Sequence, residues 1–153
     1  MIIENKLKEL NINIPLPPKP GAIYVAAVKC GDYIYVSGQT PKDGVNLLYK
    51  GKLGRDLSTK EGYEASKICI LRSLSAIKDI VSDLDKIERI IKLTGFVNSC
   101  EDFIEQSQVI DGASELLEQI FGEEGKHARS AIGVSALPGN AAVEIELIVK
   151  VKN

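Results

Sequence analysis

Apolar side chains occupy every second position of the stretch from residue 143 to residue 151. They are Val143, Ile145, Leu147, Val149 and Val151, and Glu144, Glu146 and Lys150 alternate with them. A period of two is that of a β-strand whose one face is buried while the other faces water or a ligand. The chain is therefore expected to build a sheet with one covered face, and the cover must come from elsewhere in the sequence.

Two amphipathic segments can supply this cover. Ser58-Thr59-Lys60-Glu61 has the S-x-x-E form of a capping box and predicts the start of a helix. The helix carries an apolar stripe at spacings of 4, 3, 4 and 3, formed by Ile70, Leu74, Ile77, Val81 and Leu84. A second stripe, formed by Val109, Ala113, Leu116 and Ile120, predicts another helix that ends at Gly122.

The remaining segments predict strands and turns. Residues 24–30 and 33–37 are rich in β-formers and are separated by Gly31-Asp32, which predicts a hairpin. Residues 41–56 contain three glycines and predict a long loop with at most a short strand at residues 45–49. Residues 87–97 and 130–134 predict two further strands. We expect the turn at residues 137–140 to bring the strand of Glu144 back antiparallel to the strand of Arg129.

This order of strands and helices is typical of an α+β fold with both helices on one face of the sheet. No third helix is expected to cover the second face, so we expect a homo-oligomer in which these faces meet. At 153 residues the chain has the length of one domain. We divide it into an N-terminal arm, residues 1–20, with a short helix and a proline-rich end, and a single domain, residues 21–153.

Composition argues against several classes of protein. The net charge is −2, and the chain has three Phe, five Tyr and no Trp, so it lacks the basic, aromatic surface of a nucleic-acid binder. No apolar run approaches the roughly 20 residues of a membrane span. The three widely spaced cysteines, with Cys69 expected in the core, favour free thiols and a cytoplasmic location.

Few residues are candidates for chemistry. Arg129 opens a strand among small residues and can either stack at the surface or bind a carboxylate through its planar fork. Glu144 is either an outward carboxylate or a group within reach of a ligand that Arg129 holds. Ser37-Gly38 ends a strand where a backbone N–H can approach a ligand. His127 is the single histidine, and we expect it to be exposed, with no hydroxyl or acid placed beside it.

Several of these segments together resemble one known family. Tyr24, Ser37-Gly38-Gln39, Ala128-Arg129-Ser130, Leu137-Pro138 and Val143-Glu144-Ile145-Glu146 follow one another as in the RidA (YjgF) family of imine deaminases, also called endoribonuclease L-PSP. The resemblance covers about residues 20–151. It implies a chorismate-mutase-like α+β fold with a mixed sheet, and a homotrimer with clefts between subunits. Glu101 in place of the family's usual asparagine, a longer 41–56 loop and the arm indicate a longer subgroup.

The resemblance also implies a reaction, the hydrolysis of 2-imino or enamino acids to 2-keto acids and ammonia. Arg129 would bind the substrate carboxylate and Glu144 would orient the attacking water, without metal or organic cofactor. Tyr24 and Ser37 would line the cleft, which the Gly38 backbone and the Ala131 carbonyl would complete. Two alternatives remain open: a trimer that binds small acids without catalysis or serves regulation, and a ribonuclease or translation inhibitor.

Overall fold

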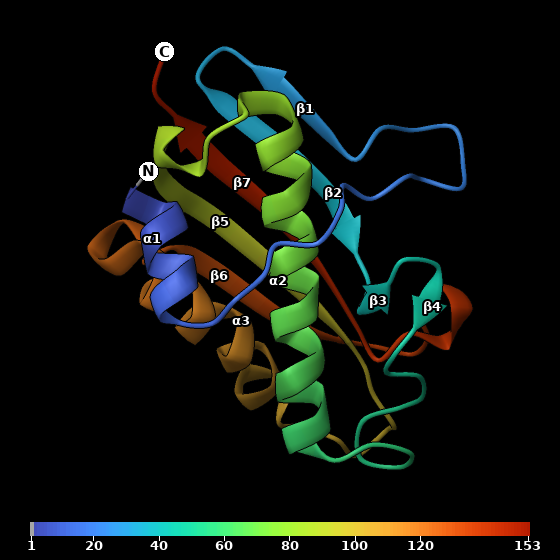
Figure 1. Ribbon diagram of the computed structural model, residues 1–153. Helices are drawn as coiled ribbons and strands as arrows, with labels where there is room; N and C mark the ends of the chain where they lie inside the picture. Colours follow the sequence, from blue (N-terminus) through green and yellow to red (C-terminus); the bar gives the residue numbers. More distant parts are fainter. Residues whose placement is uncertain (1) are drawn as a thin grey trace.

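The alternating residues near the C-terminus form the central strand of a five-stranded sheet. The computed structural model describes residues 2–153. Its helices are α1 (Ile2–Glu9), α2 (Thr59–Val81) and α3 (Gln106–Phe121), with short 3-10 helices η1 (Leu84–Lys86), η2 (Gly122–Gly125) and η3 (Pro138–Asn140). Its strands are β1 (Ala27–Cys30), β2 (Tyr33–Gln39), β3 (Lys42–Asp43), β4 (Asn46–Leu47), β5 (Ile87–Asn98), β6 (Ala128–Val134) and β7 (Val143–Val151) (Figure 1).

The main sheet is mixed, and its strand order is β1-β2-β7-β5-β6. The β5–β6 pair is parallel, and the other three pairs are antiparallel. β7 therefore lies in the middle, between β2 and β5. Its apolar side chains are buried as the alternation predicted, and Glu144, Glu146 and Lys150 lie on the opposite face. The α+β class and the mixed sheet are confirmed.

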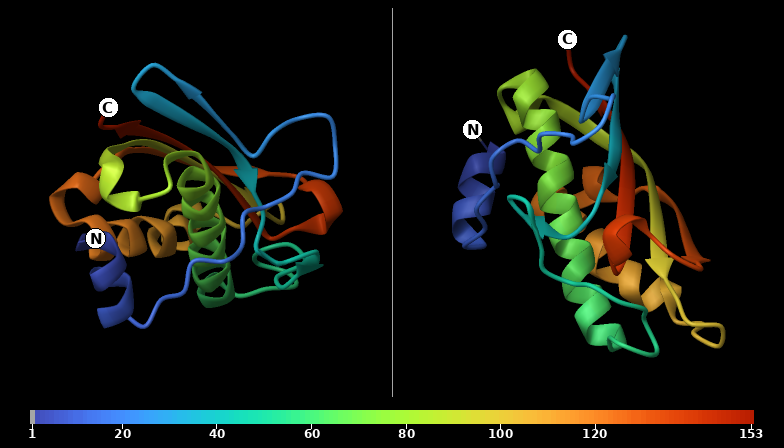
Figure 2. Two further views of the ribbon diagram at one scale, coloured as in Figure 1. Left: turned by 45° about the horizontal axis from the view of Figure 1, so that its top comes forward. Right: turned by 90° about the vertical axis from the view of Figure 1, so that its right-hand side faces the viewer.

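The helices cover one face of this sheet (Figure 2). α2 begins at the predicted capping box, in which the Glu61 N–H donates to Ser58 Oγ at 3.2 Å and the Ser58 N–H donates to Glu61 Oε2 at 2.7 Å. α3 ends at Gly122, as predicted. Two helices were expected in this layer, but α1 lies on the same side of the sheet as well and buries Leu7 in the core. The first residues thus add a third helix that packs against α3 and η1.

Two strand predictions are wrong in detail. The first strand begins at Ala27, and Tyr24 lies in the preceding bend rather than in the sheet. β6 and β7 do not form a hairpin, since β5 lies between them and pairs with both. The turn after Leu137 is present, but it carries the chain past β5 instead of to the next position in the sheet. Sequence pattern alone does not show this insertion.

The long loop of residues 41–56 holds more structure than the one short strand expected. β3 and β4 pair within it, and its end lies against the turn that precedes β7. The Gly51 N–H donates to the Asn140 carbonyl at 2.8 Å, and the Lys52 ammonium donates to Asn98 Oδ1 at 3.0 Å. Asn98 is fully buried and its amide also donates to the Ala141 carbonyl. The loop is therefore part of the structure at the carboxyl end of β5.

The second face of the sheet carries no helix (Figure 2, right). Large side chains are exposed there on three strands: Val28, Tyr33, Tyr35 and Ile132. This open face, as we call it, is the sheet surface opposite α2 and α3. Within residues 2–153 no helix combines the length and apolar composition that crossing a bilayer requires.

Candidate functional site

Glu144 is the second residue of β7 and lies on the open face, opposite Phe96 of β5. β2 has an irregular register between Val36 and Gln39, and this bulge places Gly38 beside Glu144. A Cβ atom at residue 38 would lie 2.7 Å from Glu144 Oε1, so a side chain there would displace the carboxylate. Position 38 therefore has to be glycine for Glu144 to sit where it does.

The Glu144 carboxyl group is half-buried, and its environment raises its pKa. Burial is the larger cause, because a carboxylate loses hydration at this depth, and the nearby charge of Glu146 adds to it. A carboxyl group with a raised pKa holds and releases a proton nearer to neutral pH than an ordinary glutamate does. Glu144 thus has the properties of a general base.

Ser37 fixes the segment before β1 next to this carboxyl group. Its hydroxyl donates to the Val25 carbonyl at 2.6 Å, and its backbone N–H donates to the Ala26 carbonyl at 2.8 Å. The adjoining Tyr24 has an exposed side chain. Tyr24, Ser37, Gly38 and Glu144 thus share one end of the β2–β7 pair, and we call this set the Glu144 half-site.

Arg129 belongs to β6, the edge strand on the other side of the sheet. It is in register with the fully buried Leu93, so its side chain points to the helical face. There its Nη1 donates to Asp111 Oδ1 of α3 at 2.8 Å. Ala131, two residues on, is in register with Gly95 and lies partly buried against the core. Arg129 and Ala131 form what we call the Arg129 half-site.

One chain does not bring the two half-sites together. The predicted hairpin would have placed Glu144 within reach of a ligand on Arg129, but β5 separates their strands. With neighbouring strands about 4.8 Å apart, β7 and β6 lie roughly 10 Å apart. The two side chains also point to opposite faces of the sheet. A site that uses both residues therefore needs a second copy of the chain.

His127 is placed differently from its prediction. The ring is partly buried rather than exposed, and its Nε2 lies 2.9 Å from the hydroxyl oxygen of Ser114. Its Nδ1 lies 2.7 Å from the Gly125 carbonyl oxygen. Burial is the main cause that lowers the pKa of His127, and the charge of Arg129 contributes. Sequence spacing missed Ser114, because the hydroxyl comes from α3, 13 residues before the histidine.

The remaining predicted residues lie outside the half-sites. Glu101, at the position of the family's asparagine, is exposed in the turn after β5. Cys69 is fully buried in the core, as expected, and burial raises the pKa of its thiol. Cys30, Cys69 and Cys100 are all free thiols.

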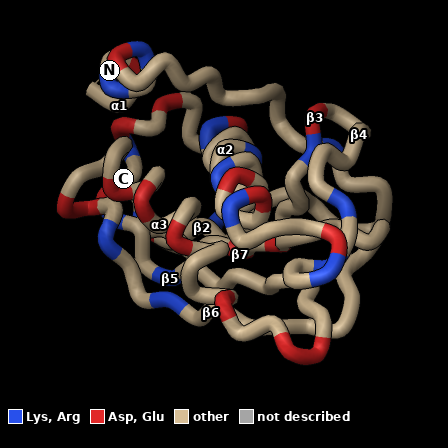
Figure 3. Tube along the Cα trace, turned by 90° about the horizontal axis from the view of Figure 1, so that it is seen from below, with Lys and Arg blue, Asp and Glu red and all other residues tan. Residues whose placement is uncertain are grey.

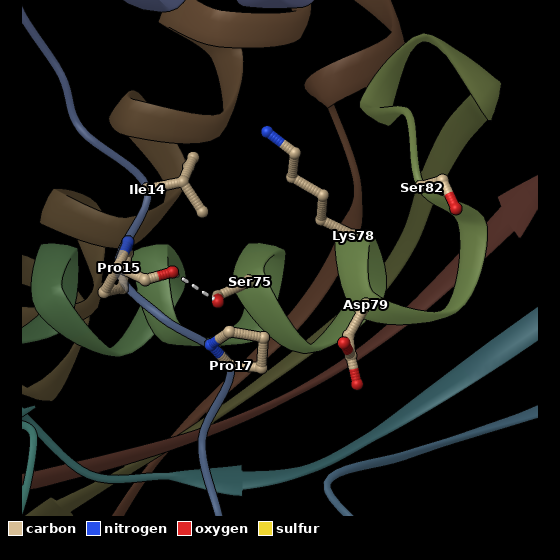
Figure 4. A pocket seen from close by; sticks show the side chains of 7 residues that line it. All are labelled: Ile14, Pro15, Pro17, Ser75, Lys78, Asp79 and Ser82. Carbon is tan, nitrogen blue, oxygen red and sulfur yellow. Dashed lines mark hydrogen bonds between the residues drawn. The ribbon is translucent and has the colours of Figure 1, made fainter.

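A pocket of about 360 Å³ lies where the N-terminal arm crosses α2 (Figure 4). It is lined by Ile14, Pro15, Pro17, Ser75, Lys78, Asp79 and Ser82. The Ser75 hydroxyl donates to the Pro15 carbonyl at 2.6 Å, and Lys78 is paired with Glu4 at 2.5 Å. These contacts fasten the arm to α2, and none of the predicted site residues lines the pocket. We therefore place the candidate site at the half-sites.

Charged residues of both signs are interspersed over the chain as it is seen in Figure 3. Several of the surface cations are paired with acids, including Arg89 with Glu124 and Lys126 with Glu123. A surface of mixed sign does not release the counterions that drive binding to a phosphate backbone.

Comparison with known proteins agrees with the sequence resemblance. A family model described as "YjgF/chorismate_mutase-like, putative endoribonuclease" matches residues 15–151. Protein TCP17 of Trypanosoma cruzi is 43% identical over 148 residues, which cover 96% of this chain and 92% of TCP17. A crystal structure of a protein of unknown function from Agrobacterium tumefaciens is 41% identical, with a TM-score of 0.92 over 99% of this chain and 93% of that one.

A third relative has a name that states an activity. The 2-iminobutanoate/2-iminopropanoate deaminase of Dermatophagoides farinae is 30% identical over 142 residues, which cover 92% of this chain and 95% of the deaminase. From the family model, these relatives and the shared fold, it follows that this chain belongs to the YjgF/chorismate-mutase-like family, which includes the RidA proteins.

Proposed function

We propose that the protein hydrolyses 2-imino acids to 2-keto acids and ammonia, in clefts between the subunits of a homotrimer. The observation that carries the proposal is the division of the site: Arg129 and Glu144 lie on separate strands and opposite faces of one chain. An open sheet face with exposed tyrosines is suited to contact with another copy. Such contact would set the Glu144 half-site of one chain against the Arg129 half-site of its neighbour.

The chemistry needs few groups. The Arg129 guanidinium binds the substrate carboxylate and thereby fixes the position of C2. The ionised Glu144 accepts a proton from a water molecule, whose oxygen attacks C2 of the C=N bond. The nitrogen gains protons as the C–N bond breaks, ammonia leaves, and C2 keeps the oxygen as a ketone. One water is consumed, and no electrons are exchanged with a cofactor.

The surroundings of Glu144 support this role. Its raised pKa makes it a stronger proton acceptor than an exposed glutamate, yet it must be ionised to act. The turnover rate should therefore fall on the acid side at a pH above the usual pKa of a glutamate. The name of the Dermatophagoides farinae relative also supports the reaction class.

The proposal is tested by combining two inactive variants. Arg129→Lys and Glu144→Gln are co-expressed so that chains assemble at random, and ammonia release is measured with an imine generated in situ by a dehydratase. A cleft needs one intact half-site from each of two chains, so the mixture should recover about a quarter of the wild-type activity, while each variant alone is nearly inactive.

The other outcomes overturn the proposal in different ways. If the mixture shows no recovery although both variants fold and assemble, the two residues do not act across subunits. If the wild type binds 2-oxobutanoate but releases no ammonia from any imine tested, the chain is a binder of small acids and not a deaminase. Cleavage of single-stranded RNA that disappears in Arg129→Ala would instead favour a ribonuclease.

A further inference from the structure

Three residues of α3 form a row of hydrogen-bond acceptors for Arg129. Its Nη1 donates to Asp111 Oδ1 at 2.8 Å and to Ser114 Oγ at 3.2 Å, and its Nη2 donates to Ser107 Oγ at 3.4 Å. Residues 107, 111 and 114 are spaced by four and three, so they share one face of the helix. α3 therefore holds the guanidinium mainly through the two hydrogen bonds that Nη1 donates.

These hydrogen bonds leave the edge formed by Nε and Nη2 of the guanidinium available to a ligand. An arginine has five N–H groups in a fixed plane, and a carboxylate binds to two that point the same way. Both hydrogens of Nη1 are directed to Asp111 and Ser114, whereas the edge of Nε and Nη2 has, within residues 2–153, only the long contact to Ser107. The row orients the plane without occupying the fork that the proposed function uses.

His127 fixes the direction of the Ser114 hydroxyl. A carbonyl oxygen only accepts hydrogen bonds, so the contact of Nδ1 with Gly125 places the ring proton on Nδ1. Nε2 of the neutral ring then accepts the Ser114 hydroxyl proton. The lone pairs of Ser114 are left to accept from Arg129. A chain of hydrogen bonds thus runs from the Gly125 carbonyl through His127 and Ser114 to Arg129.

The charges around the ring favour its neutral state. The ring lines two open pockets, of about 210 and 340 Å³, whose charged lining residues are Arg89 of β5, Glu118 of α3, Lys126 and Arg129. Burial is the largest cause and lowers the pKa of His127, and the charge of Arg129 lowers it further. The hydrogen bond with the Gly125 carbonyl and the charge of Glu118 act in the opposite direction, but the net pKa is lowered. The ring is therefore neutral at neutral pH, as the chain of hydrogen bonds requires.

We propose that Ser114 and His127, together with Asp111, are positioning residues that hold the guanidinium of Arg129 in the plane in which its Nε–Nη2 edge receives the substrate carboxylate. The inference rests on the proposed function for the identity of the ligand. The hydrogen-bond chain itself is a property of the single chain. The hydrogen-bond chain and the effect on ligand binding are therefore tested by separate measurements.

The first measurement concerns the histidine tautomer and needs no substrate. His127 is the single histidine of the chain, so its ring signals in a ¹⁵N NMR spectrum are assigned without ambiguity. At pH 7.5 we expect the proton on Nδ1, and we expect Arg129→Gln to raise the pKa of His127, since a neighbouring positive charge is removed. A proton on Nε2, or an unchanged pKa in Arg129→Gln, would overturn the network.

The second measurement concerns the ligand. Ser114→Ala should weaken binding of 2-oxobutanoate, and raise KM for the imino acid, by about 2- to 12-fold with little change in kcat, which is the usual effect of one lost hydrogen bond. Ser114→Thr keeps the hydroxyl and should restore both values. Gln119→Ala, an exposed change on the same helix, is the matched control.

The two sets of results separate the two proposals. If Ser114→Ala has the same affinity for 2-oxobutanoate and the same KM as Gln119→Ala, Ser114 does not position Arg129. The same holds if Ser114→Thr binds as weakly as Ser114→Ala. If the wild type neither binds 2-oxobutanoate nor hydrolyses an imine, the proposed function fails and the positioning role for a carboxylate fails with it. An Nδ1 proton would still show that the hydrogen-bond chain exists.

Discussion

Glu144 is a half-buried carboxyl group. The charge of Glu146, on the same strand, lies close enough to act on it. Within residues 2–153 no ion pair reaches it. Its pKa is raised in the folded chain, so the fold favours the protonated form. The associated stability is present at low pH and is lost as the pH rises from the ordinary glutamate pKa through the raised one. At neutral pH Glu144 thus lowers the free energy of unfolding.

Glu144→Gln should therefore act in opposite directions on stability and on activity. The neutral amide avoids burying a charge, so the melting temperature at pH 7 should rise, and its difference from wild type should shrink in acid. Turnover of an imino acid should fall strongly, while binding of 2-oxobutanoate stays nearly intact, because the proposed role is to orient water. Calorimetry and the ammonia assay check this. An equal loss of binding and turnover would make Glu144 a structural residue.

Arg129→Lys should lose most of the activity while the fold remains. Lysine keeps the positive charge but lacks the planar fork, and a charge-assisted pair of this kind contributes about 1.5–3 kcal/mol, or roughly 10- to 150-fold in affinity. The assay and the melting temperature are measured on the same preparation. Wild-type turnover in this variant, or failure to fold, would contradict the role of Arg129 as the carboxylate-binding group.

Sequence alone indicated which residues to test but not what surrounds them. The resemblance to the RidA family singled out Arg129 and Glu144, whereas the residues alone left both open as surface groups. Asp111 and Ser114 carried no signal, since they are ordinary polar residues on a helix until the fold sets that helix beside β6. Contacts between distant segments depend on how elements are arranged, and a local pattern does not encode them.

At the scale of elements, α2 and α3 pack unusually closely at one glycine. A Cβ atom at Gly112 would lie 2.2 Å from the backbone carbonyl oxygen of Tyr63 and 2.5 Å from Ser66 Oγ. Backbone atoms cannot turn aside as a flexible side chain does. The distance between the two helices therefore depends on residue 112 having no side chain. The position of Ser107, Asp111 and Ser114 beside Arg129 depends on it in turn.

Gly112→Ala should destabilise the protein by about 1–3 kcal/mol, although alanine is the better helix former, because the helices must move apart. Gly21→Ala is a suitable control, since a Cβ there meets nothing within 4 Å, and it should change stability by less than about 0.5 kcal/mol. Urea unfolding of both variants checks the difference. Equal stability would show that the helices repack without strain.

The elements themselves were largely predictable, and their pairing was not. Apolar spacing and caps located α2, α3 and β7 because these signals are local. The parallel neighbour of β6 is β5, joined through α3, whereas the sequence suggested the strand that follows directly. Both arrangements bury the same side chains of β6 and β7, so the hydrophobic pattern does not distinguish them.

At the scale of the whole molecule, the open face predicts self-association. Val28, Tyr33, Tyr35 and Ile132 leave apolar surface exposed on a sheet that the three helices cover on its other face only. Light scattering should give three times the 16.6 kDa of one chain. Tyr35→Glu, which places a charge in this face, should shift the mass toward that of one chain and reduce deaminase activity in parallel. A wild-type monomer would refute the trimer.

The central position of β7 has a consequence for how the protein is made. β2 and β5 have no bond to each other, and β7, the last strand along the chain, pairs with both. A ribosome releases the chain from its N-terminal end, so β2 and β5 leave the tunnel before β7, and the edge that each of them pairs with β7 is still open. Two open edges invite pairing with other nascent chains. Completion of the sheet, and protection from aggregation, must wait until residues 143–151 have emerged.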